Sequence, residues 1–183
     1  HTGDSFSMKR AKQATLFDDF YRGKKVLVTG STGFKGSWLS LWLYDLGACV
    51  TGLALPPQTS PSHFDLVDLN HLINQIDGDI CDMKIIQQVF DEVRPEIVFH
   101  LAAQAIVRDS YDHPKSTFDT NIGGTVNMLE AVRQCTSVRA VVVVTSDKCY
   151  ENKEWLWGYR ENDPLGGHDP YSASKGAAEI VCA

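Results

Sequence analysis

The segment TGSTGFKG, residues 29–36, places three glycines three residues apart directly after a short apolar run. The run predicts a strand over residues 25–29, and the following periodicity predicts a helix from about 34 to 46 with Gly47 at its end. The expected apolar face of this helix consists of Phe34, Trp38, Trp42 and Leu46. A strand, a tight turn and a helix in this order begin a unit whose next strand runs parallel to the first. The segment therefore favours an α/β fold.

The rest of the chain continues to alternate between strand and helix patterns. Apolar runs predict further strands over residues 49–55, 76–80, 97–101 and 138–145. Helical spacing predicts helices over 82–93, over 114–135 and after Asp169, which can cap the last one with Pro170 in first position. The helix over 114–135 has an apolar stripe and two glycines that predict close backbone packing: Phe118, Ile122, Val126, Leu129, Val132, Gly123 and Gly124. This alternation predicts one doubly wound, mostly parallel α/β sheet of the Rossmann type.

The most apolar of the expected strands ends in a polar triplet. Four valines at residues 141–144 predict a strand that is buried on both faces, as in a parallel sheet covered by helices. Thr145 and then Ser146, Asp147 and Lys148 follow directly. Ligands of open α/β sheets bind at the carboxyl ends of the strands. The triplet is therefore expected to face a ligand.

Charge and cysteine usage exclude several classes of partner. The formal net charge is −6 and there is no extended cluster of basic residues, which argues against nucleic acid or an anionic membrane as the main partner. The apolar stretch at residues 38–43 is too short to span a bilayer. Five cysteines without a C-x-x-C spacing indicate neither a disulfide framework nor a zinc site, and favour the cytoplasm. No metal is assigned to His63, His71, His100, His113 or His168, because they lack ligand spacing.

The chain divides into an extension and one domain. Residues 1–7 precede the first methionine and are either a remnant of cloning or a natural extension. We assign residues 1–22 to this extension and residues 23–183 to a dinucleotide-binding domain.

The glycine turn predicts a nucleotide site. Backbone N–H groups of such a turn can approach a pyrophosphate at the positive end of the following helix. The expected contacts are Gly30, Gly33, Phe34, Lys35 and Gly36. The acid that normally reads the adenosine ribose is missing, because Ala54 and Leu55 stand at the end of the second strand. That strand therefore specifies neither NAD nor NADP.

Three motifs in register resemble the extended short-chain dehydrogenase/reductase family. They are the glycine turn, LAAQ at residues 101–104 and YSASK at residues 171–175. In its nucleotide-sugar 4,6-dehydratase branch, the strand that ends at Ser146 usually carries Thr-Asp-Glu. The triplet Ser-Asp-Lys, with TGFKGSWLSLWL and DKCYENKEWLWGYREND, is similar to the members that act on CDP-glucose.

This resemblance implies a reaction, a cofactor and an assembly. NAD would take hydride from C4 of CDP-glucose or another nucleotide sugar, water would leave across C5 and C6, and the hydride would return to C6. The product would be the CDP-4-keto-6-deoxy sugar. Members of this branch continue beyond the last residue seen here into a smaller substrate-binding domain, and they form homodimers through the helices that correspond to residues 114–135 and to the region after Pro170.

The resemblance also implies roles for five residues. Tyr171 would be the base at the C4 hydroxyl, and because a phenol titrates near 10 in water it would need Lys175 and the nicotinamide charge to ionise. Ser146 would bind the same oxygen, or else satisfy its own loop backbone. Asp147 would protonate the departing C6 hydroxyl, and Lys148 would remove the C5 proton, provided that the chain turns at Asp147. The alternatives are a surface pair for Tyr171 and Lys175, and a solvated or ion-paired Lys148.

Further cofactor contacts would come from Asp79, Ile80, Leu101, Ala102, Ala103 and Gln104, with Tyr171 and Lys175 at the nicotinamide end. Asp79 can instead cap the helix over 81–93. Asn121 either ties its helix to the neighbouring strand or lies on an open helix face. The aromatic residues of the loop, Trp155, Trp157 and Tyr159 with Arg160, either frame the substrate mouth or close the loop against the core. The competing functions are a related epimerase or reductase and a non-catalytic dinucleotide sensor.

Overall fold

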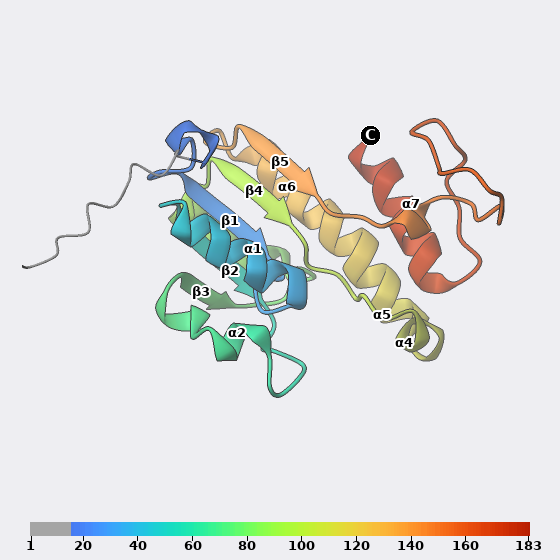
Figure 1. Cartoon of the computed structure of the whole chain (residues 1–183), viewed down its shortest axis with the longest axis horizontal. Coiled ribbons are helices and arrows are strands. Elements are labelled where there is room, and N and C mark those ends of the chain that lie inside the picture. The colour runs from blue at the N-terminus through green and yellow to red at the C-terminus, as the bar shows by residue number, and fades with distance from the viewer. Residues whose placement is uncertain (1–15) are drawn as a thin grey trace, which may run out of the picture.

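Five parallel strands form the centre of the molecule, in the order β3-β2-β1-β4-β5 (Figure 1). The structure is a computed structural model that describes residues 16–183. The strands are β1 (Lys25–Thr29), β2 (Cys49–Ala54), β3 (Asn74–Asp77), β4 (Ile97–His100) and β5 (Ala140–Val143). The helices are α1 (Phe34–Asp45), α2 (His63–Leu66), α3 (Met83–Val93), α4 (Val107–Asp112), α5 (Pro114–Phe118), α6 (Thr125–Gln134) and α7 (Pro170–Cys182), and the short turns are η1 (Leu16–Asp19), η2 (Leu69–His71), η3 (Asp119–Gly124) and η4 (Asp147–Cys149). The doubly wound parallel α/β fold that the sequence predicts is confirmed.

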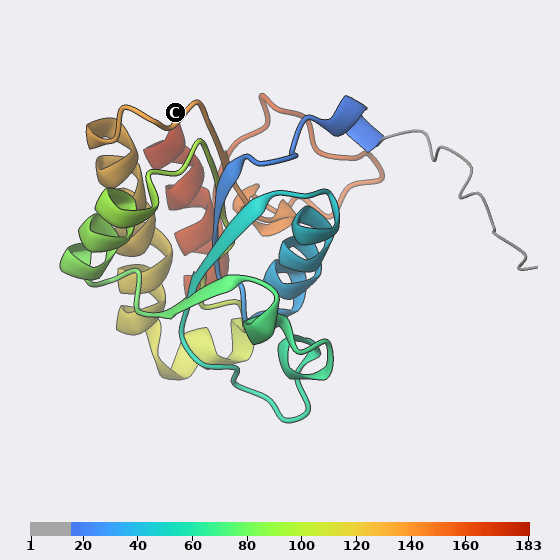
Figure 2. The same ribbon diagram turned by 90° about the vertical axis from the view of Figure 1, so that its left-hand side faces the viewer.

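Helices cover the two faces of the sheet unequally. Side chains of β1 alternate between the faces, so that Leu27 joins the core under α3 and α6 while Val26 and Val28 join the core under α1. Figure 2 shows the sheet nearly edge-on, with α3 and α6 on one side and α1 and α2 on the other. Because all five strands are parallel, the glycine turn and the other loops that follow the strands meet at the carboxyl edge of the sheet.

The expected orientation of α1 is wrong. Its buried residues are Gly36, Ser37, Ser40 and Leu43, whereas Phe34, Trp38 and Trp42 are 77%, 52% and 48% exposed. Because Gly36 must face the glycine turn, residues 34 and 38, each two positions away and thus rotated by roughly 200°, must point outward. The small residues let the helix lie close to the sheet, and the aromatic stripe faces away from it.

Strand β5 is not buried on both faces as its four valines predict. It pairs with β4 alone, and Val142 is 45% exposed. The strand is also shorter than expected, because its ladder covers only residues 140–143. An edge strand has one neighbour, and on the face that carries Val142 and its register partner Phe99 the covering helix, α1, packs over β1 and β2 rather than over β5. Strand β3 begins two residues earlier than expected and ends at Asp77, three residues earlier, which leaves Ile80 outside the strand.

The predicted long helix over residues 114–135 is continuous but contains a π-helical segment. Helices α5 and α6 flank η3, whose ends have helical backbone angles. The expected apolar stripe is not the buried face, because Phe118 and Val126 are exposed while Thr117, Asn121 and Met128 are buried. The extra residue of the π segment shifts the face that a regular helix would bury. Of the two glycines, a Cβ at Gly124 would lie 2.4 Å from Ile80, whereas one at Gly123 would meet nothing within 4 Å.

The end of the expected N-terminal extension lies beside α1. Residues 1–15 fall outside the described part of the chain. The Phe17 ring lies 5.8 Å from that of Trp42, and the N–H of Gly23 donates to the carbonyl of Gly47. No helix of residues 16–183 is both long and apolar enough to cross a bilayer.

Candidate nucleotide and catalytic site

The glycine turn after β1 is closed too tightly for side chains. Gly30 has a φ of +71°, and a Cβ there would lie 2.8 Å from the backbone nitrogen of Ala102. A Cβ at Gly36 would lie 2.0 Å from the carbonyl oxygen of Gly30. Gly33 begins α1 without a side-chain cap. Backbone N–H groups at the start of α1 therefore remain for an anion, as in other phosphate-binding turns.

The end of β2 lacks a ribose-reading acid, as the sequence indicates. Ala54 is buried and Leu55 is half exposed. The hydroxyl of Thr32, in the glycine turn, donates to the carbonyl of Leu55 at 2.7 Å. These contacts fix the turn against the strand end.

A buried histidine joins the ends of β1 and β4 to α6. The hydroxyl of Thr125 donates to the carbonyl of Asn121, so Nε2–H of His100 donates to Thr125 and Nδ1 accepts from Thr29, with distances of 3.1 and 2.7 Å to the two hydroxyls. Burial, with a smaller contribution from the nearby Lys175 charge, lowers the pKa of His100 to about 4. A neutral ring fits both hydrogen bonds.

Asn121 holds the segment after β4. Its side chain accepts from the N–H of Gln104 at 2.8 Å and donates to the carbonyl of the same residue at 3.1 Å and to Ser174 Oγ at 2.8 Å. Ser174 in turn donates to the carbonyl of Tyr171. The prediction that Asn121 ties its helix to the neighbouring strand end is confirmed, and it reaches α7 as well. Leu101 to Gln104 thereby line the edge beside the glycine turn, where a Cβ at Gly30 would meet Ala102.

The polar triplet forms a turn at the end of β5. Residues 147–149 make one 3₁₀ turn, as expected from the need to turn at Asp147. The hydroxyl of Ser146 accepts from the N–H of Lys148 and donates to Asp147, both at 3.1 Å. This matches the alternative in which the Ser146 hydroxyl forms hydrogen bonds within its own loop. Asp147 and Lys148 are exposed, and Lys148 makes no ion pair within residues 16–183.

Helix α7 carries Tyr171 and Lys175 one turn apart. Asp169 caps the helix by accepting from the N–H of Ser172, as predicted. Lys175 is 6% exposed, and its ammonium donates to the carbonyl of Val144 at 3.4 Å. Burial and then the charge of Lys35 lower the pKa of Lys175, against an opposing effect of Glu179. Lys175 is therefore not the surface lysine of the alternative interpretation.

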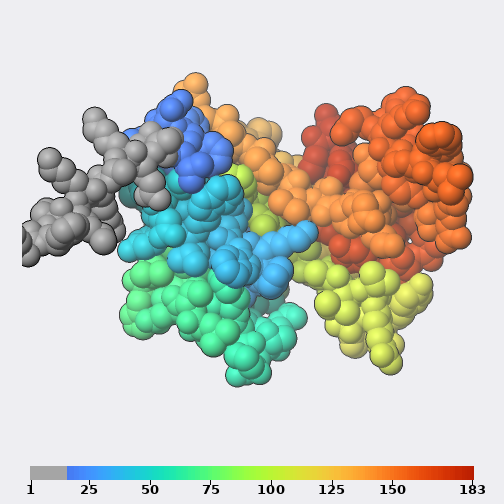
Figure 3. Space-filling model, in the orientation of Figure 1, coloured from blue at the N-terminus to red at the C-terminus, as the bar shows by residue number. Residues whose placement is uncertain are grey.

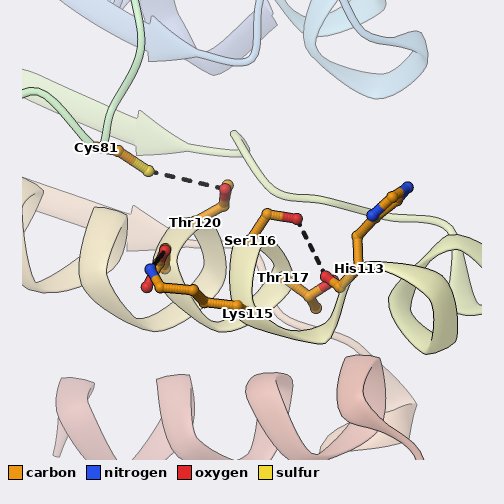
Figure 4. Close-up of polar contacts among 7 residues, drawn as sticks. Cys81, His113, Lys115, Ser116, Thr117 and Thr120 are labelled. Atoms are coloured by element: carbon orange, nitrogen blue, oxygen red, sulfur yellow. Dashed lines mark hydrogen bonds and ion pairs between the residues drawn. The ribbon is translucent and has the colours of Figure 1, made fainter.

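The turn after β3 packs against the helix that begins at Pro114. Asp79 accepts from the N–H of Cys81 at 2.9 Å, and the cap of α3 is Asp82, so the alternative role of Asp79 as a helix cap is wrong. Figure 4 shows Cys81 beside Thr120, with Sγ 3.7 Å from the hydroxyl. Ile80 is buried against Gly124, so any contact of Ile80 with a cofactor would come from its backbone.

Two spaces adjoin these residues. Figure 3 shows the surface hollowed between the cyan atoms of α1 and the yellow and orange atoms further along the chain. A separate cavity of about 240 Å³ lies between the triplet and the start of α7. It is lined by Asp147, Lys148, Tyr150, Asn152, Tyr159, Gly167, His168, Asp169 and Ser172. Neither Ser146 nor Tyr171 lines it, so the structure does not bring all five expected catalytic residues into one cavity.

The loop aromatics do not close the loop against the core. Trp155 and Trp157 are 46% and 73% exposed. The Tyr159 ring instead stacks on Tyr150, with centroids 5.2 Å apart. Among residues 16–183 no cluster of three or more potential metal ligands occurs.

One residue beside the triplet, Glu179, escaped sequence reasoning. Glu179 on α7 accepts a hydrogen bond from the hydroxyl of Thr145. Glu179 follows Lys175 by four residues, and this spacing predicts that the two side chains lie on the same face of the helix.

The sheet order, the glycine turn and the Tyr-Lys pair on α7 define the dinucleotide-binding half of a short-chain dehydrogenase/reductase. The chain belongs to the extended branch of this family, since residues 27–183 match the family described as GDP-mannose 4,6 dehydratase. It is 57% identical, over 89% of its length and 45% of the relative's, to CDP-glucose 4,6-dehydratase of Salmonella typhimurium (strain LT2).

Solved structures share the fold. The epimerase Mth375 of Methanothermobacter thermautotrophicus matches 92% of this chain and 50% of its own with a TM-score of 0.76 and 31% identity. UDP-glucose 4-epimerase of Brucella ovis in complex with NAD matches 86% of this chain and 46% of its own, with a TM-score of 0.73 and 27% identity. The chain thus spans about half the length of the relatives it matches.

Proposed function

We propose that this chain forms the NAD-binding part of an enzyme that converts CDP-glucose to CDP-4-keto-6-deoxyglucose. The observation that carries the proposal is the Ser146-Asp147-Lys148 turn packed against the helix of Tyr171 and Lys175, in a chain 57% identical to a CDP-glucose 4,6-dehydratase. The triplet and the helix lie side by side and would supply groups for oxidation at C4 and for elimination across C5 and C6.

The glycine turn fits a dinucleotide. Gly30 and Gly36 leave no room for side chains, and the free start of α1 suits the pyrophosphate. Lys35 would add positive charge there, and Asp79 and the backbone of Ile80 would meet the adenosine end. Leu101, Ala102, Ala103 and Gln104 would line the ribose, and Tyr171 and Lys175 would lie at the nicotinamide. NAD, when bound, would accept hydride from C4 of the sugar and return it to C6.

The residues of the chain would move the protons. Tyr171 accepts the proton of the C4 hydroxyl, and the Lys175 ammonium stabilises the phenolate. Ser146 donates to the C4 oxygen after its hydroxyl turns away from Asp147. Lys148, as the neutral amine, takes the C5 proton, which the C4 ketone makes acidic, and Asp147, as the carboxylic acid, protonates the C6 hydroxyl so that it departs as water.

A nucleotide-sugar epimerase is the second candidate, since both structures compared above are named as epimerases. The two activities differ in the mass of the product, because a dehydratase removes one water from the sugar and an epimerase does not. With CDP-glucose and NAD, mass spectrometry of the full-length protein's product should show the loss of one water. A product of unchanged mass and altered stereochemistry would favour an epimerase, and unchanged substrate beside bound NAD would favour a sensor.

We also propose that the protein forms a homodimer in the cytoplasm. Val126 on α6 and Ile180 on α7 are 46% and 67% exposed apolar residues on adjacent helices, which suits burial against a second copy. All five cysteines are free thiols, which suits a reducing compartment. Sedimentation equilibrium tests the dimer, because Val126→Glu should shift it to a monomer.

A further inference from the structure

Helix α7 contacts residues on both sides of the polar triplet. The hydroxyl of Thr145, which precedes the triplet, donates to Glu179 Oε1. The thiol of Cys149, which follows it, is buried, and burial together with the Glu179 carboxylate raises the pKa of Cys149. Glu179 therefore holds the residue before the triplet by a hydrogen bond, and its charge acts on the residue after the triplet.

Two other residues of α7 approach the same segment. The Lys175 ammonium donates to the carbonyl of Val144 at 3.4 Å. A Cβ at Gly176 would lie 3.1 Å from the carbonyl oxygen of Cys149, so the helix backbone lies directly beside the turn. The hydrogen bonds of Glu179 and Lys175 are directed and tolerate less sliding than the backbone contact at Gly176, and Glu179 is the side chain that binds the residue directly before the triplet.

We propose that Glu179 is a positioning residue that holds the Ser146-Asp147-Lys148 turn in register with Tyr171 and Lys175. Only three residues separate Thr145, which Glu179 binds, from Cys149, whose carbonyl packs beside Gly176, so holding both leaves the turn few arrangements. The consequence for catalysis rests on the proposed function, whereas the consequence for the order of the turn does not.

The first test measures order without chemistry. In the 183-residue chain, hydrogen exchange by NMR follows the amides of Lys148, Cys149 and Tyr150, which donate within the turn. Glu179→Ala should accelerate their exchange by about 10- to 150-fold, the effect of losing one hydrogen bond to a charged group. Glu179→Gln, which keeps an acceptor oxygen, should restore most of the protection. Glu92→Ala, at an exposed position of α3, is the matched control and should change nothing.

The amide of Ile86 in α3 reports general loosening. Unchanged exchange in the turn of Glu179→Ala would overturn the proposal, and so would equal acceleration at Ile86, which would make Glu179 a residue of general stability.

The second test measures catalysis in the full-length protein. Glu179→Ala should lower kcat by about 10- to 100-fold, as expected for displaced catalytic groups, while NAD affinity and KM stay the same. Thr145→Val should have a similar effect, and the double variant should be no worse than either single one. Additive losses or an unchanged kcat would overturn the proposal. If the unmodified protein forms no dehydrated product, the proposed function fails, and the exchange experiment alone decides the positioning role.

Discussion

Gly36 lies against Gly30 so closely that a Cβ at position 36 would come within 2.0 Å of the Gly30 carbonyl oxygen. This contact fixes both the depth of α1 on the sheet and its rotation. It also explains why the aromatic residues two positions to either side face outward.

Gly36→Ala should therefore deform the glycine turn and lower the free energy of unfolding by about 1–3 kcal/mol, the usual cost of overpacking. Urea unfolding followed by circular dichroism measures it. Gly123→Ala is the control, because a Cβ there meets nothing and removes a helical glycine, which should stabilise the chain by up to about 1 kcal/mol. Equal stability of the two variants would show that the turn can open.

Stability should fall on acidification because of His100. Its pKa is about 4 in the folded chain against 6.5 for an ordinary histidine, so the unfolded chain binds more protons between these two values. The contribution of neutral His100 is fully present above 6.5 and is lost as the pH falls to 4, and it amounts to about 3 kcal/mol. His100→Gln should remove this part of the pH dependence in urea unfolding. The lowered pKa values of Glu96 and Glu130 act equally in both proteins. Identical slopes would show that folding does not lower the pKa of His100.

Binding of NAD to the chain should be weak for this fold, since Ala54 and Leu55 replace the ribose-reading acid. Leu55→Asp should tighten binding by about 10- to 150-fold through a charge-assisted hydrogen bond. Leu55 is the suitable position because it is half exposed, whereas a carboxylate at buried Ala54 would lose its hydration. Titration calorimetry compares the variant with Leu55→Asn. Nanomolar binding by the unmodified chain would refute the argument.

Lys148→Met should separate oxidation from elimination in the full-length protein. Tyr171 and Lys175 are untouched, so C4 oxidation should continue while removal of the C5 proton stops. Stopped-flow absorbance with CDP-glucose should show accumulated reduced cofactor, and C5 should exchange little deuterium from heavy water. Normal turnover with full C5 exchange would assign the base to another residue and return Lys148 to the solvated interpretation.

The order of elements could be predicted from the sequence because each relevant signal is local. Gly47 ends α1 with a φ of +82°, Asp169 caps α7, and the valines of β5 form a strand. The faces that these elements bury could not be predicted in the same way. The rotation of α1 depends on Gly36 meeting Gly30, and the exposure of Val142 depends on which strands exist beside β5.

The candidate site was predictable where a motif is short and was not predictable where it joins distant segments. Tyr171 and Lys175 lie one turn apart on any helix. The hydrogen bonds of Asn121 to Gln104 and Ser174 join residues 17 and 53 positions away, and the contact of Thr145 with Glu179 spans 34. No periodicity in the sequence encodes such contacts, since they depend on the sheet order.

All four tryptophans lie at the surface, Trp38 and Trp42 on α1 and Trp155 and Trp157 in the loop before α7. Emission of the folded chain will therefore already be that of water-exposed indole, and its wavelength will shift little on unfolding. Intrinsic fluorescence is consequently a poor measure of the stability of this fold. Trp155 and Trp157 are instead well placed to report closure of their loop, since burial of either ring under a bound nucleotide sugar would move the emission to the blue.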